Sequence, residues 1–306
     1  MSLLAKISTT LDDRSARLAG IVLMLASICM FSFGDTLGKY IVSTYSVGQL
    51  MFLRACAALA LLAPSMWRQR HEFLLIERPW LQLLRLIFST FEIAAFFLAT
   101  VYLPLADVVT YYLATPIFVT ALSAIFLREH VGLRRWSAIL VGFVGVLIAL
   151  RPSAQSISWP AMIALAGSLS FSCSLLTTRL LRATPDIVLA SAQFVSGLIF
   201  GLLIAPIGWV TPSWSSLGLF FAAGAISVCA LLCVNRSLKL APASLVVPYQ
   251  YTMVLWAVTF GYLVFGDVPS LPMALGAVII IIGAGLYIFL RERELGRIDS
   301  VVNPPA

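Results

Sequence analysis

Among the ionisable residues within otherwise apolar stretches of the chain, four are the most informative: Asp35, Lys39, Arg54 and Glu92. A charge held in the hydrocarbon of a membrane costs roughly 2.5 to 3.5 kcal/mol, so such residues persist where they pair or line water. Two interpretations stay open. The residues form a structural set of ion pairs between neighbouring helices, or they form a polar vestibule that attracts a charged or zwitterionic solute.

The depth of these residues in their apolar stretches indicates a different role for Glu92 than for the other three. Asp35 and Arg54 each lie seven residues from the expected outer end of a helix, about 10 Å below the boundary. Lys39 follows Asp35 by four residues and shares its helix face. Glu92 lies near the middle of its stretch. A carboxyl group at that depth can carry a proton or bind a solute amine, which makes Glu92 the candidate for proton coupling.

Aromatic and amide side chains in two later apolar stretches form a second set of candidates. They are Tyr111, Tyr112, Tyr249, Gln250, Tyr251 and Trp256. Tyr249 and Trp256 share one face of an expected helix, and such a stripe is either packing or a cavity wall. The phenol and amide groups need partners in a dry core, and a cavity would supply water and solute as those partners.

The apolar stretches predict ten membrane-spanning helices, since each is long enough to cross the hydrocarbon. They cover residues 18–42, 47–66, 80–102, 105–127, 134–150, 159–181, 186–207, 214–235, 241–265 and 272–290. Apolar types make up 61% of the 306 residues and charged types only 11%, against about a quarter in soluble proteins. The connecting loops are too short for a soluble catalytic domain. Pro116 and Pro248 each predict a kink.

The basic residues predict the orientation. Sixteen of the 20 Lys and Arg residues fall on the side of the N-terminus and two on the other. The excess predicts a multi-pass protein of the cytoplasmic (inner) membrane with both termini in the cytoplasm. The net charge of +7 therefore implies no nucleic-acid partner. The first apolar stretch is longer than a signal-peptide core and is expected to be retained.

Cysteine and histidine usage predicts neither a metal site nor a cofactor. The five cysteines lie in apolar stretches and are expected to be free thiols, and the two histidines lack partners at ligand spacing.

An internal duplication organises the chain. Glu129, Ala138 and Gly145 recur as Asp267, Gly276 and Gly283, 138 residues later. Each half holds five expected spans, and an odd number of crossings inverts the second half relative to the first. We therefore predict an all-α membrane protein of ten transmembrane helices in two inverted five-helix repeats. The repeats cover residues 18–152 and 153–291, with cytoplasmic tails at 1–17 and 292–306.

The first and sixth spans also correspond, at an offset of 140 residues. Lys39 then matches Arg179. Because of the inversion, Arg179 is expected at the inner end of its helix, where it is the candidate for an inner gate.

Several motifs resemble the EamA family of the drug/metabolite transporter superfamily. They are Phe52-Leu53-Arg54, Leu103-Pro104-Leu105-Ala106-Asp107, Arg128-Glu129 and Gly142-Phe143-Val144-Gly145-Val146. The resemblance covers about residues 18 to 291. It implies two inverted five-helix repeats and transport of amino acids or related metabolites, commonly by export.

These observations predict a secondary transporter that works by alternating access, as a monomer or homodimer in the lipid bilayer. No phosphate-binding GxxxxGK loop occurs, so ATP is not expected to drive transport directly.

A broad-specificity exporter of amino acids, including aromatic ones, is the preferred function. The alternatives are export of drugs or cationic toxins, and import of riboflavin or a nucleoside-like metabolite. An intramembrane enzyme using Asp35 and Asp267 is disfavoured because these carboxyls are expected in different layers. A structural or receptor role is also disfavoured.

Overall fold

The computed structural model describes residues 3–74, 78–103, 105–126 and 158–265, with short pieces between 132 and 148 and at 275, 278 and 279. Within these residues every regular element is a helix. Six of the helices are long and apolar enough to cross a membrane. They are α1 (Leu3–Val42), α2 (Val47–Arg68), α3 (Pro79–Tyr102), α7 (Trp159–Leu180), α8 (Asp186–Ile204) and α9 (Trp214–Leu240).

These six helices confirm six of the predicted spans, with ends that differ by at most five residues except at the start of α1. Local chemistry explains several of the ends. Ser46 and Ser213 cap α2 and α9, where each hydroxyl accepts a backbone N–H from the third residue beyond it. Prolines occupy the first turn of α3 and α7, where an amide hydrogen has no helical partner. The predicted spans 134–150 and 272–290 lie mostly outside the described residues.

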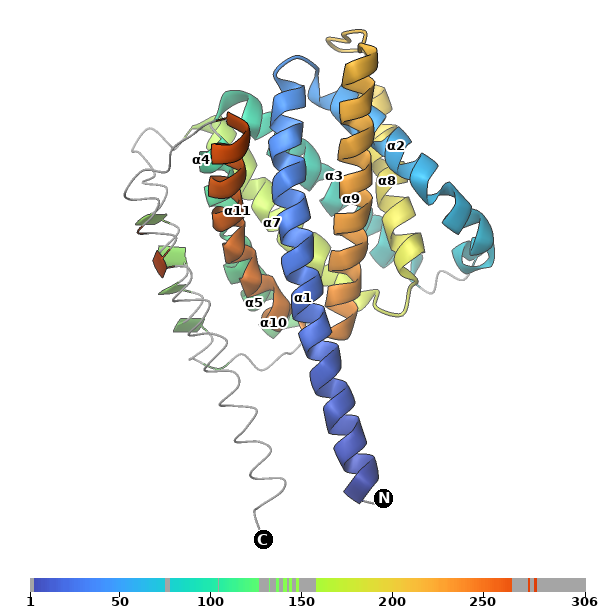
Figure 1. Cartoon of the computed structure of the whole chain (residues 1–306), viewed down its shortest axis with the longest axis vertical. Coiled ribbons are helices and arrows are strands. Elements are labelled where there is room, and N and C mark those ends of the chain that lie inside the picture. Colours follow the sequence, from blue (N-terminus) through green and yellow to red (C-terminus); the bar gives the residue numbers. More distant parts are fainter. Residues whose placement is uncertain are drawn as a thin grey trace.

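The long helices pack in pairs, each with one member from either half of the chain. Helix α1 lies along α9, α2 along α8, and α3 along α7. Figure 1 shows α1 beside α9 at the front of the bundle and α2 beside α8 to its right. The partners run in reversed order along the sequence, so the two halves interleave, and each of the two apolar core clusters draws residues from both halves.

The fourth and ninth predicted spans are not continuous α-helices, which corrects the sequence prediction. Residues 105–126 form α4 (Leu105–Tyr112) and α5 (Thr115–Phe126). Residues 243–265 form α10 (Ala243–Val246), the 3-10 helix η3 (Val247–Thr252), α11 (Met253–Phe260) and the π-helical turn η4 (Gly261–Phe265). Pro116 and Pro248 lie at these breaks, and proline removes a backbone hydrogen bond from a continuous helix. Both breaks are in the bundle interior, where neighbouring groups can satisfy the freed backbone.

Close approach of α2 and α8 depends on two glycines. A Cβ atom on Gly201 would lie 2.5 Å from the backbone nitrogen of Phe52, and one on Gly48 would lie 2.8 Å from the backbone nitrogen of Ala205. The two helices therefore touch backbone to backbone, as small residues allow in membrane bundles.

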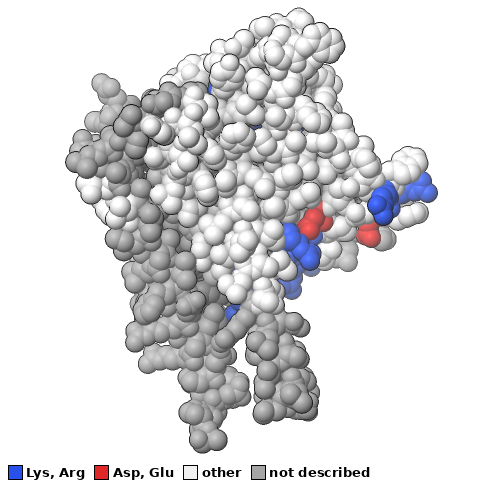
Figure 2. Space-filling view, viewed as in Figure 1, with Lys and Arg blue, Asp and Glu red and all other residues white. Residues whose placement is uncertain are grey.

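The outer surface fits a lipid environment. Large apolar side chains such as Leu203 and Ile207 are more than 70% exposed. Exposed tryptophans lie at or beside helix ends, where indoles favour the headgroup level: Trp67, Trp80, Trp159, Trp209 and Trp214. Figure 2 shows a face that is mostly uncharged, with most of its visible charged side chains at about mid-height toward the right. The chain is a multi-pass membrane protein.

Candidate functional site

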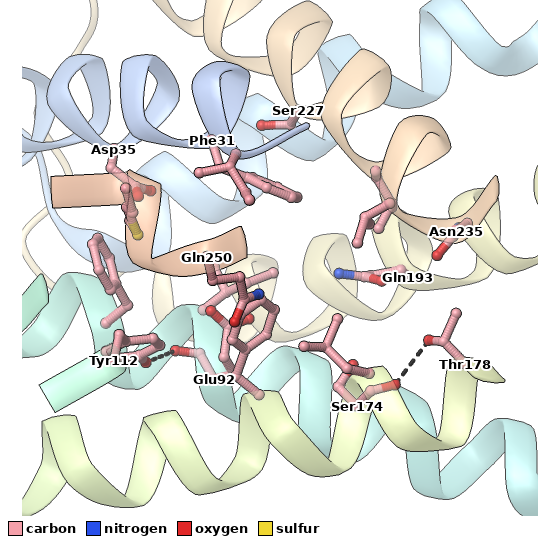
Figure 3. Close-up of a pocket in the computed structure, with 18 of the residues that line it drawn as sticks. Phe31, Asp35, Glu92, Tyr112, Ser174, Thr178, Gln193, Ser227, Asn235 and Gln250 are labelled. Carbon is pink, nitrogen blue, oxygen red and sulfur yellow. Dashed lines mark hydrogen bonds between the residues drawn. The ribbon is translucent and has the colours of Figure 1, made fainter. Parts of the chain in front are cut away.

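A cavity of about 120 Å³ lies inside the bundle, which is room for several water molecules. Its walls come from α1, α2 and α3 of the first half and from α7, α8 and α9 of the second, with further residues from α4, η3 and α11. Figure 3 shows Asp35, Glu92 and Gln250 toward one side of this cavity and Gln193, Thr178 and Asn235 toward the other. The cavity is thus shared by the two halves of the chain.

One side of the cavity carries three ionisable groups that the sequence analysis singled out. Asp35, Arg54 and Glu92 come from α1, α2 and α3 and all line the cavity. Arg54 interacts electrostatically with both carboxyl groups. Its guanidinium also lies 5.4 Å from the centre of the Phe97 ring, a cation–π distance. The three groups carry one net negative charge when all are ionised.

Aromatic rings form the walls beside these charges. The rings that line the cavity are those of Phe31, Phe96, Phe97, Tyr112, Phe171 and Phe194. Tyr112 is held firmly: its hydroxyl donates to the backbone oxygen of Glu92 at 2.9 Å. Its ring makes an edge contact with Phe96 at 5.0 Å. Apolar rings with a few placed polar groups are the usual lining of a small-molecule site.

The other side of the cavity contains Arg85, to which the sequence analysis gave no role. Arg85 is 1% exposed and donates to Thr178 Oγ1 at 2.7 Å, to the backbone oxygen of Leu189 at 3.0 Å and to Gln193 Oε1 at 2.9 Å. The signal was available, because Arg85 is an ionisable residue within a predicted span, as Arg54 is. Asn235 and Ser227 also line the cavity. No periodic pattern in the sequence indicated that these two residues belong to a site.

Five of the ten predicted cavity residues line this cavity: Asp35, Arg54, Glu92, Tyr112 and Gln250. The others lie elsewhere. Lys39 is partly exposed near the end of α1 and Tyr111 is partly buried on α4. Tyr249 and Tyr251 are buried in the two apolar core clusters. Trp256 stacks on Phe260 with ring centres 6.0 Å apart.

The stripe of Tyr249 and Trp256 is lost for a geometric reason. A 3-10 helix has 3.0 residues per turn and an α-helix has 3.6. Tyr249 lies in 3-10 helix η3, whereas Trp256 lies in α11. The single-face argument assumed one continuous α-helix, so it does not carry across this junction.

Arg179 lies in a polar cluster at the end of α9, called here the α9-end cluster: Arg179, Thr184, Asp186, Leu238 and Lys239. Arg179 donates to the backbone oxygens of Leu238 at 2.5 Å and Lys239 at 3.1 Å. Lys239 forms an ion pair with Asp186 at 2.6 Å and donates to the backbone oxygen of Thr184. Basic side chains here satisfy the last carbonyls of a helix. The cluster joins α7, α8 and α9; a gating role for Arg179 stays a prediction.

We expect the α9-end cluster to contribute to stability. Replacing Lys239 with methionine removes the ion pair to Asp186, which is partly exposed, and should lower the free energy of unfolding by about 1–2 kcal/mol. Thermal unfolding of the purified protein in detergent measures the change. Arg236→Met is the matched control, because Arg236 is exposed on the same helix. Equal losses in both variants would contradict a specific role for the cluster.

Comparison with known proteins places the chain in a family. Residues 18–151 and 158–289 each match the family described as the EamA-like transporter family. The chain belongs to this family. The two matched segments correspond to the two predicted repeats, so the EamA two-repeat architecture is confirmed. Both matched segments contribute to the cavity.

Similar proteins of known function are transporters with different named solutes. An S-adenosylmethionine uptake transporter of Rickettsia felis is 23% identical over 286 residues, which cover 92% of this chain and 96% of that protein. A riboflavin transporter of Vibrio cholerae is 30% identical over 205 residues, covering 65% and 68%. A pseudopaline exporter of Pseudomonas aeruginosa is 24% identical over 269 residues, covering 86% and 94%. The family and these relatives point to a transporter rather than an intramembrane enzyme.

A solved crystal structure shares the fold. It superposes with a TM-score of 0.73 at 18% identity and covers 92% of this chain and 98% of that chain. At that identity the likeness concerns the fold alone.

Proposed function

We propose that this protein is a secondary transporter of amino-acid-type zwitterions, including those with a bulky aromatic or heteroaromatic part. The observation that carries the proposal is the cavity shared by the two repeats, where Asp35, Arg54 and Glu92 face a space walled by aromatic rings. Charges of both signs suit a zwitterion, and the rings suit a large flat group. Amino acids are the simplest solutes of this class, and export of them is the direction that the sequence favours.

Alternating access between inverted repeats is part of the proposal. The reversed order of helix pairs, α1 with α9, α2 with α8 and α3 with α7, is what a two-fold axis in the membrane plane would produce. The breaks in the fourth and ninth predicted spans also support it, since discontinuous helices are common beside the sites of such transporters. The inner-membrane location with cytoplasmic termini rests on the distribution of Lys and Arg.

The named relatives support this solute class and one alternative to it. S-adenosylmethionine, the solute named for several relatives, is an amino acid that carries a sulfonium cation and an adenine ring. Riboflavin, named for two others, has a large flat ring system and no fixed charge. The aromatic walls fit both solutes, whereas the three ionisable groups favour the first.

Transport by purified protein in liposomes tests the proposal. Labelled S-adenosylmethionine, phenylalanine and riboflavin are offered separately, and solute inside the vesicles is measured against protein-free vesicles. We expect at least one of the two zwitterions to enter well above background and to be released again by excess unlabelled solute outside. Movement of riboflavin alone would replace the proposal by its alternative, and movement of none of the three would overturn it.

A further inference from the structure

The side of the cavity away from Asp35 presents hydrogen-bond donors without an anion to receive them. Among the residues that the structure describes, the hydrogen-bond partners of Arg85 are all neutral: Thr178, Leu189 and Gln193. A guanidinium has five N–H groups, and three are used here. Burial of a cation without a carboxylate is unfavourable unless a partner compensates it. Arg85 is therefore placed to receive an anion.

Two amide side chains add donors on the same side. Gln193 accepts from Arg85 with Oε1, so its NH2 group remains as a donor. Asn235 is 1% exposed, and its Nδ2 atom finds no hydrogen-bond partner in the described part of the chain. Both residues line the cavity, and Figure 3 shows Asn235 on the side of Thr178, which accepts from Arg85. A buried donor without a partner in a cavity points to an acceptor group of the solute.

The opposite side has the complementary chemistry. Asp35 and Glu92 are carboxyl groups, and Gln250, which lines the cavity from η3, leaves its Oε1 acceptor unpartnered among the described residues. Apart from the guanidinium of Arg54, this side of the cavity therefore presents mainly hydrogen-bond acceptors. This side suits an ammonium, sulfonium or similar cation.

The spacing of the two sides follows from one helix. Arg85 and Glu92 both lie on α3, seven residues apart. Seven residues make about two turns, so the two positions share a face and their backbones are about 10 Å apart along the axis. The charges of a simple α-amino acid are only about 3 Å apart, close to one hydrogen-bond length. Such a solute can engage one side of the cavity but not both.

Within the proposed transport function, we propose that Arg85, Gln193 and Asn235 form a carboxylate-binding subsite opposite Glu92. The solutes it selects carry a carboxylate at one end and a cation several bonds away at the other. An amino acid with a cationic centre in its side chain belongs to this class. Free glycine, whose charges are adjacent, does not fill the site.

Binding to the full-length protein in detergent, measured by calorimetry, tests the subsite. The probes are 6-aminohexanoate, its methyl ester, hexanoate and glycine. We expect wild type to bind 6-aminohexanoate roughly ten- to hundredfold more tightly than the ester, because charge-assisted hydrogen bonds to the carboxylate are lost in the ester. Glycine and hexanoate should bind more weakly than 6-aminohexanoate. A wild-type protein that does not distinguish 6-aminohexanoate from its ester would overturn the subsite.

Two variants assign the effect to these residues. Arg85→Gln should reduce the preference for acid over ester to within about threefold, because the acid loses charge-assisted hydrogen bonds whereas the ester loses only ordinary ones. Asn235→Asp keeps Arg85 and its three hydrogen bonds but adds a carboxylate on the same side of the cavity, so it should remove the preference even if Arg85→Gln does not fold. Gly197→Ala is the control, since a Cβ there meets nothing within 4 Å.

The outcomes separate this inference from the transport function. If wild type carries zwitterions into liposomes but Asn235→Asp and folded Arg85→Gln retain the wild-type preference, the subsite is wrong and the transporter stands. If no zwitterion crosses the liposome membrane, the proposed function itself fails.

Discussion

Replacing Gly201 with alanine should lower the free energy of unfolding by about 2 kcal/mol or more, the loss typical of overpacking a filled interior. The new methyl group would lie 2.5 Å from the backbone nitrogen and 2.9 Å from the Cα atom of Phe52, and 3.0 Å from the backbone oxygen of Gly48. These are backbone atoms of α2, so no side chain can rotate away. Helices α2 and α8 would have to separate along their whole contact.

Gly197→Ala is the matched control for this prediction. Gly197 lies one turn earlier on the same helix, and its added Cβ would meet nothing within 4 Å. Alanine is favoured over glycine in a helix by about 1 kcal/mol, so this variant should be as stable as wild type or slightly more stable. Thermal unfolding in detergent is expected to show a drop of roughly 5 °C or more for Gly201→Ala alone. Similar melting temperatures for the two variants would show that α2 and α8 can move apart with little loss of stability, and would contradict the prediction.

Replacing Glu92 with glutamine should abolish solute accumulation driven by a proton gradient and leave exchange between equal solute pools intact. Glutamine keeps the shape and most hydrogen bonds of glutamate but cannot take up or release a proton. A gradient of one pH unit supplies about 1.4 kcal/mol, enough for a tenfold accumulation when the transport of each solute is coupled to that of one proton. In vesicles that contain the variant, the solute concentration inside is therefore expected to rise only to the concentration outside.

Proteoliposomes with an imposed pH gradient measure the effect, and counterflow of labelled solute without a gradient measures exchange. Asp35→Asn is the matched control, because Asp35 is the other carboxyl among the residues that line the cavity. If Glu92→Gln accumulates solute as wild type does, the coupling group lies elsewhere. If Asp35→Asn alone loses accumulation, Asp35 takes that role.

Sequence patterns located the long helices well because length and apolarity are local properties. The six long helices of the described region begin or end within a few residues of the predicted spans at most of their boundaries, and the EamA resemblance was confirmed by the family match. The broken spans could not be placed in the same way. Hydropathy does not distinguish an α-helix from a 3-10 helix, and only Pro116 and Pro248 gave a local signal.

The candidate site was predicted in part, for an energetic reason. Asp35, Arg54 and Glu92 were found because a charge within a span demands a polar environment. The same energetic argument holds for Arg85, and applying it would have predicted that Arg85 belongs to the site. Neutral residues such as Asn235 carry a smaller penalty and give no such signal. Whether they face a cavity depends on the rotation of each helix against its neighbours, which one sequence does not specify.

The reversed pairing of helices has a consequence for biosynthesis. Helix α2 meets its partner α8 only after about 140 further residues have been added, which takes roughly 7 to 30 s at ordinary rates of translation. Until then the three long helices of the first half, α1, α2 and α3, lack their final neighbours α9, α8 and α7. Lipids, water or insertion chaperones must cover the contact surfaces of these helices during the delay. In a chain truncated between the two halves, these surfaces would never meet their partners.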